Sequence, residues 1–121
     1  MISELAALLF FVRDYAHRAH LRFPNYGTHK ALEALYEELT DSVDTLVESY
    51  QGRFDLITIG YYKPDVDPDP LQPVAEVTKF YHMVHAMRYI AIPKEETMLQ
   101  NQLDEIERVF ASALYKLRNL T

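Results

Sequence analysis

The stretch Thr97–Leu120, TMLQNQLDEIERVFASALYKLRNL, carries the most regular hydrophobic pattern in the chain. Apolar residues recur there in alternating steps of four and three, at Leu99, Leu103, Ile106, Phe110, Ala113, Leu117 and Leu120. This heptad spacing is typical of an α-helix that packs in a left-handed bundle. Thr97 and Gln100 fit the capping box that opens many helices. The pattern therefore predicts a helix over 97–120 with one continuous apolar seam.

Three further segments show helical spacing of apolar residues and predict helices over 2–21, 28–51 and 71–91. Their stripes are Leu5, Leu8, Leu9, Val12, Tyr15, Ala16 and Ala19; then Leu32, Leu35, Tyr36, Leu39, Val43, Leu46, Val47 and Tyr50; then Val74, Val77, Tyr81, Val84 and either Met87 or Arg88. Local signals mark the ends. Thr28 fits an N-cap, Gly52 fits the left-handed position past a helix, and Asp69-Pro70 fits a cap followed by proline. With only three glycines, the chain is predicted to be all-α.

The connection over residues 53–70 is long and rich in apolar residues. Its length suits a crossover that runs along a whole bundle, which would make helices 28–51 and 71–91 parallel. The predicted fold is thus a single-domain, ferritin-like four-helix bundle over residues 1–121, with up-down-down-up topology. The apolar side chains of the crossover either cover the bundle or contact a partner protein: Phe54, Leu56, Ile57, Ile59, Tyr61 and Tyr62.

Composition narrows the classes of function. A chain of 121 residues can bury one core, and 49% hydrophobic residues indicate a globular protein. A net charge of −6 argues against nucleic-acid binding, which needs clustered Lys and Arg. The absence of cysteine excludes disulfides and thiolate metal sites. Because no segment suits a membrane span or a signal peptide, we expect a cytoplasmic protein that does not bind membranes.

One arrangement of histidines and carboxylates suggests chemistry. His29 and Glu33 lie four positions apart, as do Asp44 and Glu48 further along the same predicted helix, and His20 precedes them across a turn. Residues four apart share one face of a helix. Imidazole and carboxylate together are ligands for iron or zinc rather than for calcium or magnesium. The chain has no Glu-x-x-His motif, so a di-iron centre within one bundle is not expected.

These residues resemble the core of the DNA-protecting miniferritins (Dps) over residues 5–52. The resemblance implies a di-iron, ferroxidase-type site shared by two subunits. His20, His29 and Glu33 would come from one subunit, and Asp44 and Glu48 from its two-fold mate. It also implies at least a homodimer, with iron as the metal and zinc as a substitute. His17, one turn before His20, is an alternative to it as the first ligand.

A second resemblance covers most of the chain. The segments His29-Lys30-Ala31-Leu32, Glu48 to Gly52, Leu99-Gln100-Asn101 and Tyr115-Lys116-Leu117 resemble small phage-encoded ferritin-like proteins of unknown function. This resemblance implies a location in the host cytoplasm. It also supports an alternative function without any metal, in which a helical oligomer acts as a protein-interaction or virion accessory module through the 53–70 crossover.

Other polar residues fit a structural role better. Asp41 extends the Asp44–Glu48 face and is interpreted as a solvated residue. His82 and His85 lie three apart but have no carboxylate close in sequence, so packed histidines are expected. Asp65, Asp67 and Asp69 alternate with other residues in a proline-rich stretch that lacks the glycine and glutamate of a calcium loop. No phosphate-binding loop or nucleophile motif is present.

Overall fold

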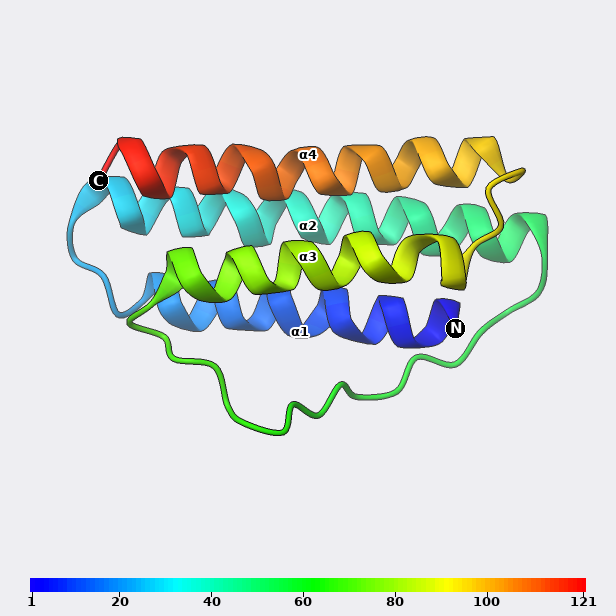
Figure 1. Ribbon diagram of the computed structural model, residues 1–121, viewed down its shortest axis with the longest axis horizontal. Helices are drawn as coiled ribbons and strands as arrows, with labels where there is room; N and C mark the ends of the chain where they lie inside the picture. The colour runs from blue at the N-terminus through cyan, green and yellow to red at the C-terminus, as the bar shows by residue number, and fades with distance from the viewer.

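The computed structural model describes all residues 1–121 and contains four helices and no strand. They are α1 (Ile2–His20), α2 (Tyr26–Arg53), α3 (Pro73–Ala91) and α4 (Thr97–Asn119). The predicted all-α class is therefore confirmed. In Figure 1 the helices lie side by side along one axis, with α2 and α3 running in one direction and α1 and α4 in the other. None of them combines the length and apolar character that a membrane crossing requires.

Each helix packs against two others around a single core. Helices α1 and α4 each pack against both α2 and α3, whereas α1 and α4, and likewise α2 and α3, lie across the diagonals of the bundle. One cluster of 26 buried hydrophobic residues lies between them. Each fully buried Leu, Ile or Phe in it contributes about 1.5–3 kcal/mol relative to exposure. Hydrophobic burial between the four stripes is therefore the main force that holds the bundle together.

The predicted stripes largely coincide with this core. All of the α1 stripe is buried, and so is the α4 stripe except for Leu120, which lies past the helix end and is exposed. The last position of the α3 stripe was predicted to be either Met87 or Arg88. Arg88 is buried there, and Met87 is only partly buried. The sequence reasoning missed Phe80, which packs edge-on against Phe11 and Tyr15. Phe80 lies three positions after Val77 and four before Val84, and this helical spacing would have allowed it to be predicted as part of the stripe.

Several of the predicted helix-end signals are wrong. Helix α2 begins before Thr28, whose hydroxyl accepts a hydrogen bond from Asn25 Nδ2 and caps no backbone N–H. Gly52 lies inside α2 and has no positive φ. No side chain caps α4, because the Gln100 amide is engaged by Arg88 and by backbone carbonyls of the α3–α4 turn. Side-chain competition of this kind is what makes cap positions hard to read from local sequence.

The segment 54–72 returns along the whole length of the bundle beside α1 (Figure 1). It is irregular, and its backbone N–H at Ile57 donates to Gln51 Oε1. Ile57 and Tyr62 pack against the core, with Tyr62 5.0 Å from Phe11 between ring centroids. Leu56 and Tyr61 instead remain 84% and 93% exposed. The segment thus covers the bundle with some of its apolar side chains and presents others to solvent.

Tyr15 ties the far end of this segment to α1. Its hydroxyl donates a 2.8 Å hydrogen bond to the backbone carbonyl of Asp69. Asp69 does not cap α3, which begins at Pro73, and its Oδ1 accepts from the Leu71 N–H instead. Burial, followed by the charges of Glu76 and Asp69, raises the pKa of Tyr15 above its usual value.

This raised pKa predicts a loss of stability at high pH. The folded state holds the phenol proton more tightly than the unfolded chain does, so the contribution is fully present below the usual tyrosine pKa of 10.0 and is lost as the pH rises further. We expect the free energy of unfolding, measured by urea titration between pH 8 and about 11, to fall more steeply for the wild type than for Tyr15→Phe. Equal slopes for the two proteins would contradict the assignment.

Candidate metal centre

Three of the five predicted ligands converge at one end of the bundle. His20 is the last residue of α1, and His29 and Glu33 lie one turn apart near the start of α2. One ligand atom from each lies within 4.8 Å of the others. His20 is buried, and His29 and Glu33 are partly exposed. The short 21–25 turn brings the two helix ends together, so that two imidazoles and a carboxylate face one point.

Backbone carbonyls select the tautomer of both imidazoles. His29 Nδ1 lies 2.8 Å from the carbonyl oxygen of His20 and 3.0 Å from that of Phe23, while His20 Nδ1 lies 3.3 Å from the carbonyl oxygen of His29. A carbonyl oxygen only accepts, so each Nδ1 carries a proton and donates. The Nε2 atoms have no hydrogen-bond partner in the protein. In metal sites this pattern orients the ring and leaves Nε2 as the ligand atom.

His17, the alternative to His20, lies outside this group. Its side chain is exposed, and its ring stacks on Tyr36 at 4.3 Å between centroids with an interplanar angle of 15°. The ring of His20 lies 4.0 Å from that of His29 and 5.3 Å from that of Tyr36. The structure therefore brings His20, not His17, to the candidate ligand group.

Glu33 is held as a carboxylate by its neighbours. Lys30 Nζ donates a 2.6 Å hydrogen bond to Glu33 Oε1. This bond, followed by the positive charge of Lys30, lowers the pKa of Glu33. The lysine competes with any metal for one oxygen and leaves the other oxygen free.

Tyr36 borders the same group and was expected only as part of the apolar stripe. Desolvation, followed by the charges of Glu33 and Glu37, raises its pKa. Its position one turn after Glu33 places it on the same side of α2, a spacing that the sequence already contained. Tyr36 therefore keeps its phenol proton and forms an aromatic wall beside the imidazoles.

Asp44 and Glu48 do not join the group within one chain. They lie on α2 eleven and fifteen positions beyond Glu33, which corresponds to about 16 and 22 Å along the helix axis. Both are exposed, and neither forms an ion pair. Together with three other acids they form an outward stripe on α2, defined here as the acidic stripe: Glu33, Glu37, Asp41, Asp44 and Glu48. A single chain thus holds two separate parts of the predicted ligand set.

The second histidine pair forms no such group. His85 Nδ1 is 3.0 Å from Glu107 Oε1, and His82 stacks beside Tyr81, both on the outside of α3. Only one group of three or more candidate ligands occurs in the structure, at His20, His29 and Glu33. Two imidazoles and one carboxylate with open positions are a ligand set suited to iron or zinc. The donor set therefore fits the predicted metals.

The model of the Family of unknown function (DUF5856) matches residues 20–117. The chain belongs to this family. A protein of Enterobacteria phage T4, described as an uncharacterized 14.6 kDa protein in the mobD-ri intergenic region, is 25% identical to it over 115 residues. The aligned region covers 95% of this chain and 86% of the phage protein. No solved structure matches the chain.

The similarity to a small phage protein agrees with one of the two resemblances drawn from the sequence. A relationship to ferritins or miniferritins is not shown by these comparisons. The DUF5856 match begins at His20 and so includes the whole ligand group. The chemistry of the site consequently rests on the geometry of this DUF5856 protein itself.

Proposed function

We propose that this protein is a ferritin-like, metal-binding four-helix bundle whose half-sites combine across a two-fold axis to form a ferroxidase-type di-iron site. The observation that carries the proposal is the convergence of His20, His29 and Glu33 within 4.8 Å, with both Nε2 atoms unpartnered. Asp44 and Glu48 of a second copy would supply the remaining ligands. The directions of the four helices, with α2 parallel to α3, also support a ferritin-like arrangement (Figure 1).

The spacing on α2 suits an antiparallel pairing of two α2 helices. The pair His29 and Glu33 and the pair Asp44 and Glu48 lie at equal distances on either side of Glu38 and Leu39. A two-fold axis crossing there would place each pair opposite the other pair of the partner copy. Such an isologous contact generates two identical sites.

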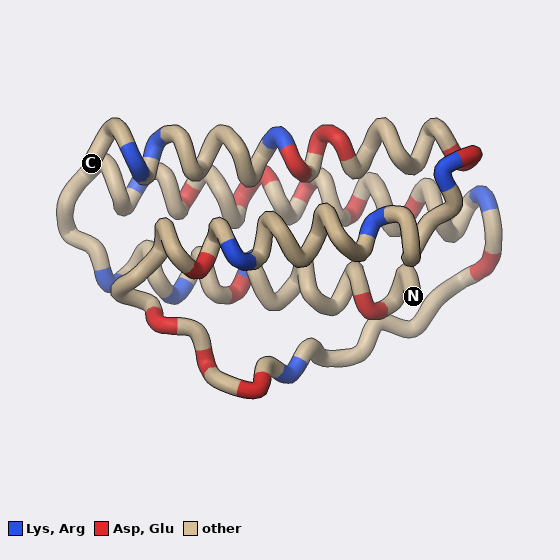
Figure 2. Tube along the Cα trace, in the orientation of Figure 1, with Lys and Arg blue, Asp and Glu red and all other residues tan.

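Charge supports a cation at this contact. Figure 2 shows acids along the length of α2 with few lysines or arginines among them. Glu37 and Asp41 would meet their counterparts near the axis, and neither is in an ion pair. Bringing two acidic stripes together is unfavourable unless cations lie between them. Metal ions held by the histidines and carboxylates would offset this repulsion.

Iron is the substrate in the proposed reaction. Two Fe(II) ions would each give one electron to one hydrogen peroxide, which takes up two protons and yields two waters and two Fe(III). Oxygen could replace peroxide as the oxidant. The carboxylates favour the ferric product because they are hard anionic ligands.

Removing the competing lysine tests the site. We expect Lys30→Gln to tighten binding of Zn(II), used as a redox-inert probe, by a few-fold in calorimetric titration, because Glu33 no longer shares an oxygen with an ammonium group. Lys79→Gln is the matched control, since Lys79 pairs with Glu76 three positions away on α3, outside the ligand group. Equal effects of the two substitutions, or weaker binding in Lys30→Gln, would count against the site.

A second function is favoured by one observation. The side chains of Leu56, Tyr61 and Val66 in the segment 54–72 are 84%, 93% and 78% exposed. These three residues place more apolar surface in contact with solvent than is usual for a segment that connects two helices. We propose as the alternative a metal-free helical oligomer that binds a partner protein through this segment. If the protein binds neither iron nor zinc, this partner-binding function replaces the ferroxidase-type function as our proposal.

A further inference from the structure

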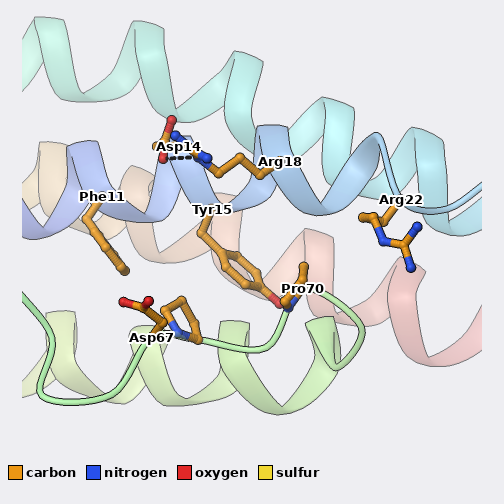
Figure 3. A pocket seen from close by; sticks show the side chains of 8 residues that line it. Phe11, Asp14, Tyr15, Arg18, Arg22, Asp67 and Pro70 are labelled. Atoms are coloured by element: carbon orange, nitrogen blue, oxygen red, sulfur yellow. Dashed lines mark hydrogen bonds and ion pairs between the residues drawn. The ribbon is translucent and has the colours of Figure 1, made fainter.

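A cavity of about 500 Å³ lies between α1 and the segment 54–72, apart from the histidine group. It is lined by Phe11, Asp14, Tyr15, Arg18, Arg22, Asp67, Pro68 and Pro70 (Figure 3). Phe11, Arg18 and Arg22 follow one another at helical spacing, whereas His20 lies on the opposite side of α1. The volume falls within the range of small-molecule sites.

The aromatic walls of this cavity are held in place by the fold. Phe11 contacts the rings of Phe80 and Tyr62, at 5.8 and 5.0 Å between centroids. Tyr15 is held by its hydrogen bond to the Asp69 carbonyl. Two prolines of the returning segment complete the apolar surface. A flat ring could therefore lie against these walls without prior rearrangement of the protein.

The polar groups of the cavity are only partly used within the protein. Arg22 and Asp67 form no ion pair and no side-chain hydrogen bond. Arg18 uses its Nε to bind Asp14 at 2.7 Å, which leaves its two terminal nitrogens free. In Figure 3 the Asp67 carboxylate lies toward Phe11, whereas Arg22 lies at the other end of the cavity. A cationic donor, Arg22, and an acceptor, Asp67, therefore lie at opposite ends of the cavity.

We propose that this cavity binds a small organic anion with a flat, hydrogen-bond-donating ring, of the chemical class of a nucleoside monophosphate. The phosphate would be bound by Arg22, whose guanidinium has no partner in the protein, because guanidinium groups recognise phosphate with two parallel hydrogen bonds. The ring would lie against Phe11 and the prolines. Asp67 would accept a hydrogen bond from an exocyclic amine. Phe11 and Arg22 lie at opposite ends of the cavity, which separates the ring from the phosphate (Figure 3).

The test is a calorimetric titration of the full chain in buffer with EDTA, so that the outcome is independent of the proposed metal site. The probes are AMP and CMP, with UMP, adenosine and inorganic phosphate as comparisons. We expect AMP and CMP to bind at least tenfold more tightly than adenosine or phosphate. They should also bind several-fold more tightly than UMP, which has no exocyclic amine for Asp67.

Two variants assign the contacts. Arg22→Gln should weaken AMP binding at least tenfold, and Asp67→Asn should reduce the preference for AMP over UMP. Arg53→Gln is the control, since Arg53 pairs with Glu96 at the other end of the bundle and should leave binding unchanged. Absence of AMP and CMP binding to the wild type overturns the proposal. Equal binding of phosphate and AMP overturns the role of the ring, and wild-type affinity in Arg22→Gln overturns the role of that arginine.

Discussion

Replacing Arg88 by Met is expected to lower the free energy of unfolding by about 3–5 kcal/mol, because it leaves buried polar groups without partners. Arg88 is only 4% exposed. Its Nε donates to Gln100 Oε1 at 2.9 Å, and its terminal nitrogens donate to the Gln100 carbonyl and to Glu107 at 2.7 Å each. A further ion pair reaches Asp104 at 2.8 Å. Methionine matches the stem of arginine and replaces none of these bonds.

The same guanidinium joins the ends of α3 and α4. Gln100, which Arg88 holds, donates to the carbonyl of Ile92 at 2.8 Å and so fixes the turn between the helices. Loss of Arg88 should therefore loosen this turn as well as expose unpaired acceptors. In thermal unfolding the expected shift is about 10–20 °C for a domain of this size.

Arg53→Met provides the control for this measurement. Arg53 also forms a bidentate pair, with Glu96, but its side chain is largely exposed. An exposed pair contributes about 0–1 kcal/mol, so this variant should unfold close to the wild type in urea. If Arg88→Met lost no more stability than Arg53→Met, the buried network would not stabilise the fold.

The second large effect is expected on metal binding. Combining His29→Ala with Glu48→Ala should weaken Zn(II) and Fe(II) binding by more than about 100-fold, because it removes a ligand from each part of the proposed shared site. Glu48 is exposed and His29 is partly exposed, so the helical circular dichroism should stay close to that of the wild type, while the unfolding midpoint falls modestly because His29→Ala leaves the carbonyls of His20 and Phe23 without their donor. Anaerobic equilibrium dialysis with each metal measures the affinity.

His82→Ala with His85→Ala is the matched control for that loss. These two histidines lie on the exposed side of α3, and neither belongs to the ligand group. The control should bind metal as the wild type does. Unchanged binding in the His29 and Glu48 variant would refute the assignment, and equal losses in both variants would indicate surface histidines acting without a defined site.

The helices were predictable because their signal is repeated many times along the chain. Each stripe offers five or more apolar positions, so an error at one position leaves the helix intact. Helix ends depend on single side chains, and the amide of Gln100 illustrates the difficulty. Its place three positions after Thr97 fits a capping box, but buried Arg88 binds it instead. That competition is between residues of different helices and has no signal in local sequence.

The candidate site was predictable in part for the same reason. His29 and Glu33 share a face because of helical spacing, and the short turn after α1 brings His20 to them. The backbone carbonyls that fix the imidazole protons depend on the conformation of that turn, which the sequence pattern does not specify. Asp44 and Glu48 can meet the histidines only in a second copy, so their role remains a prediction about assembly.

The measurement that tests the central claim most directly is native mass spectrometry of mixed variants after anaerobic exposure to Fe(II). His29→Ala breaks one part of each shared site, and Asp44→Ala with Glu48→Ala breaks the other part. Neither homodimer should retain a complete site, whereas the heterodimer of the two variants regains one. We predict metal retention in the heterodimer and none in either homodimer. A heterodimer that retains no more metal than the homodimers would contradict the shared site.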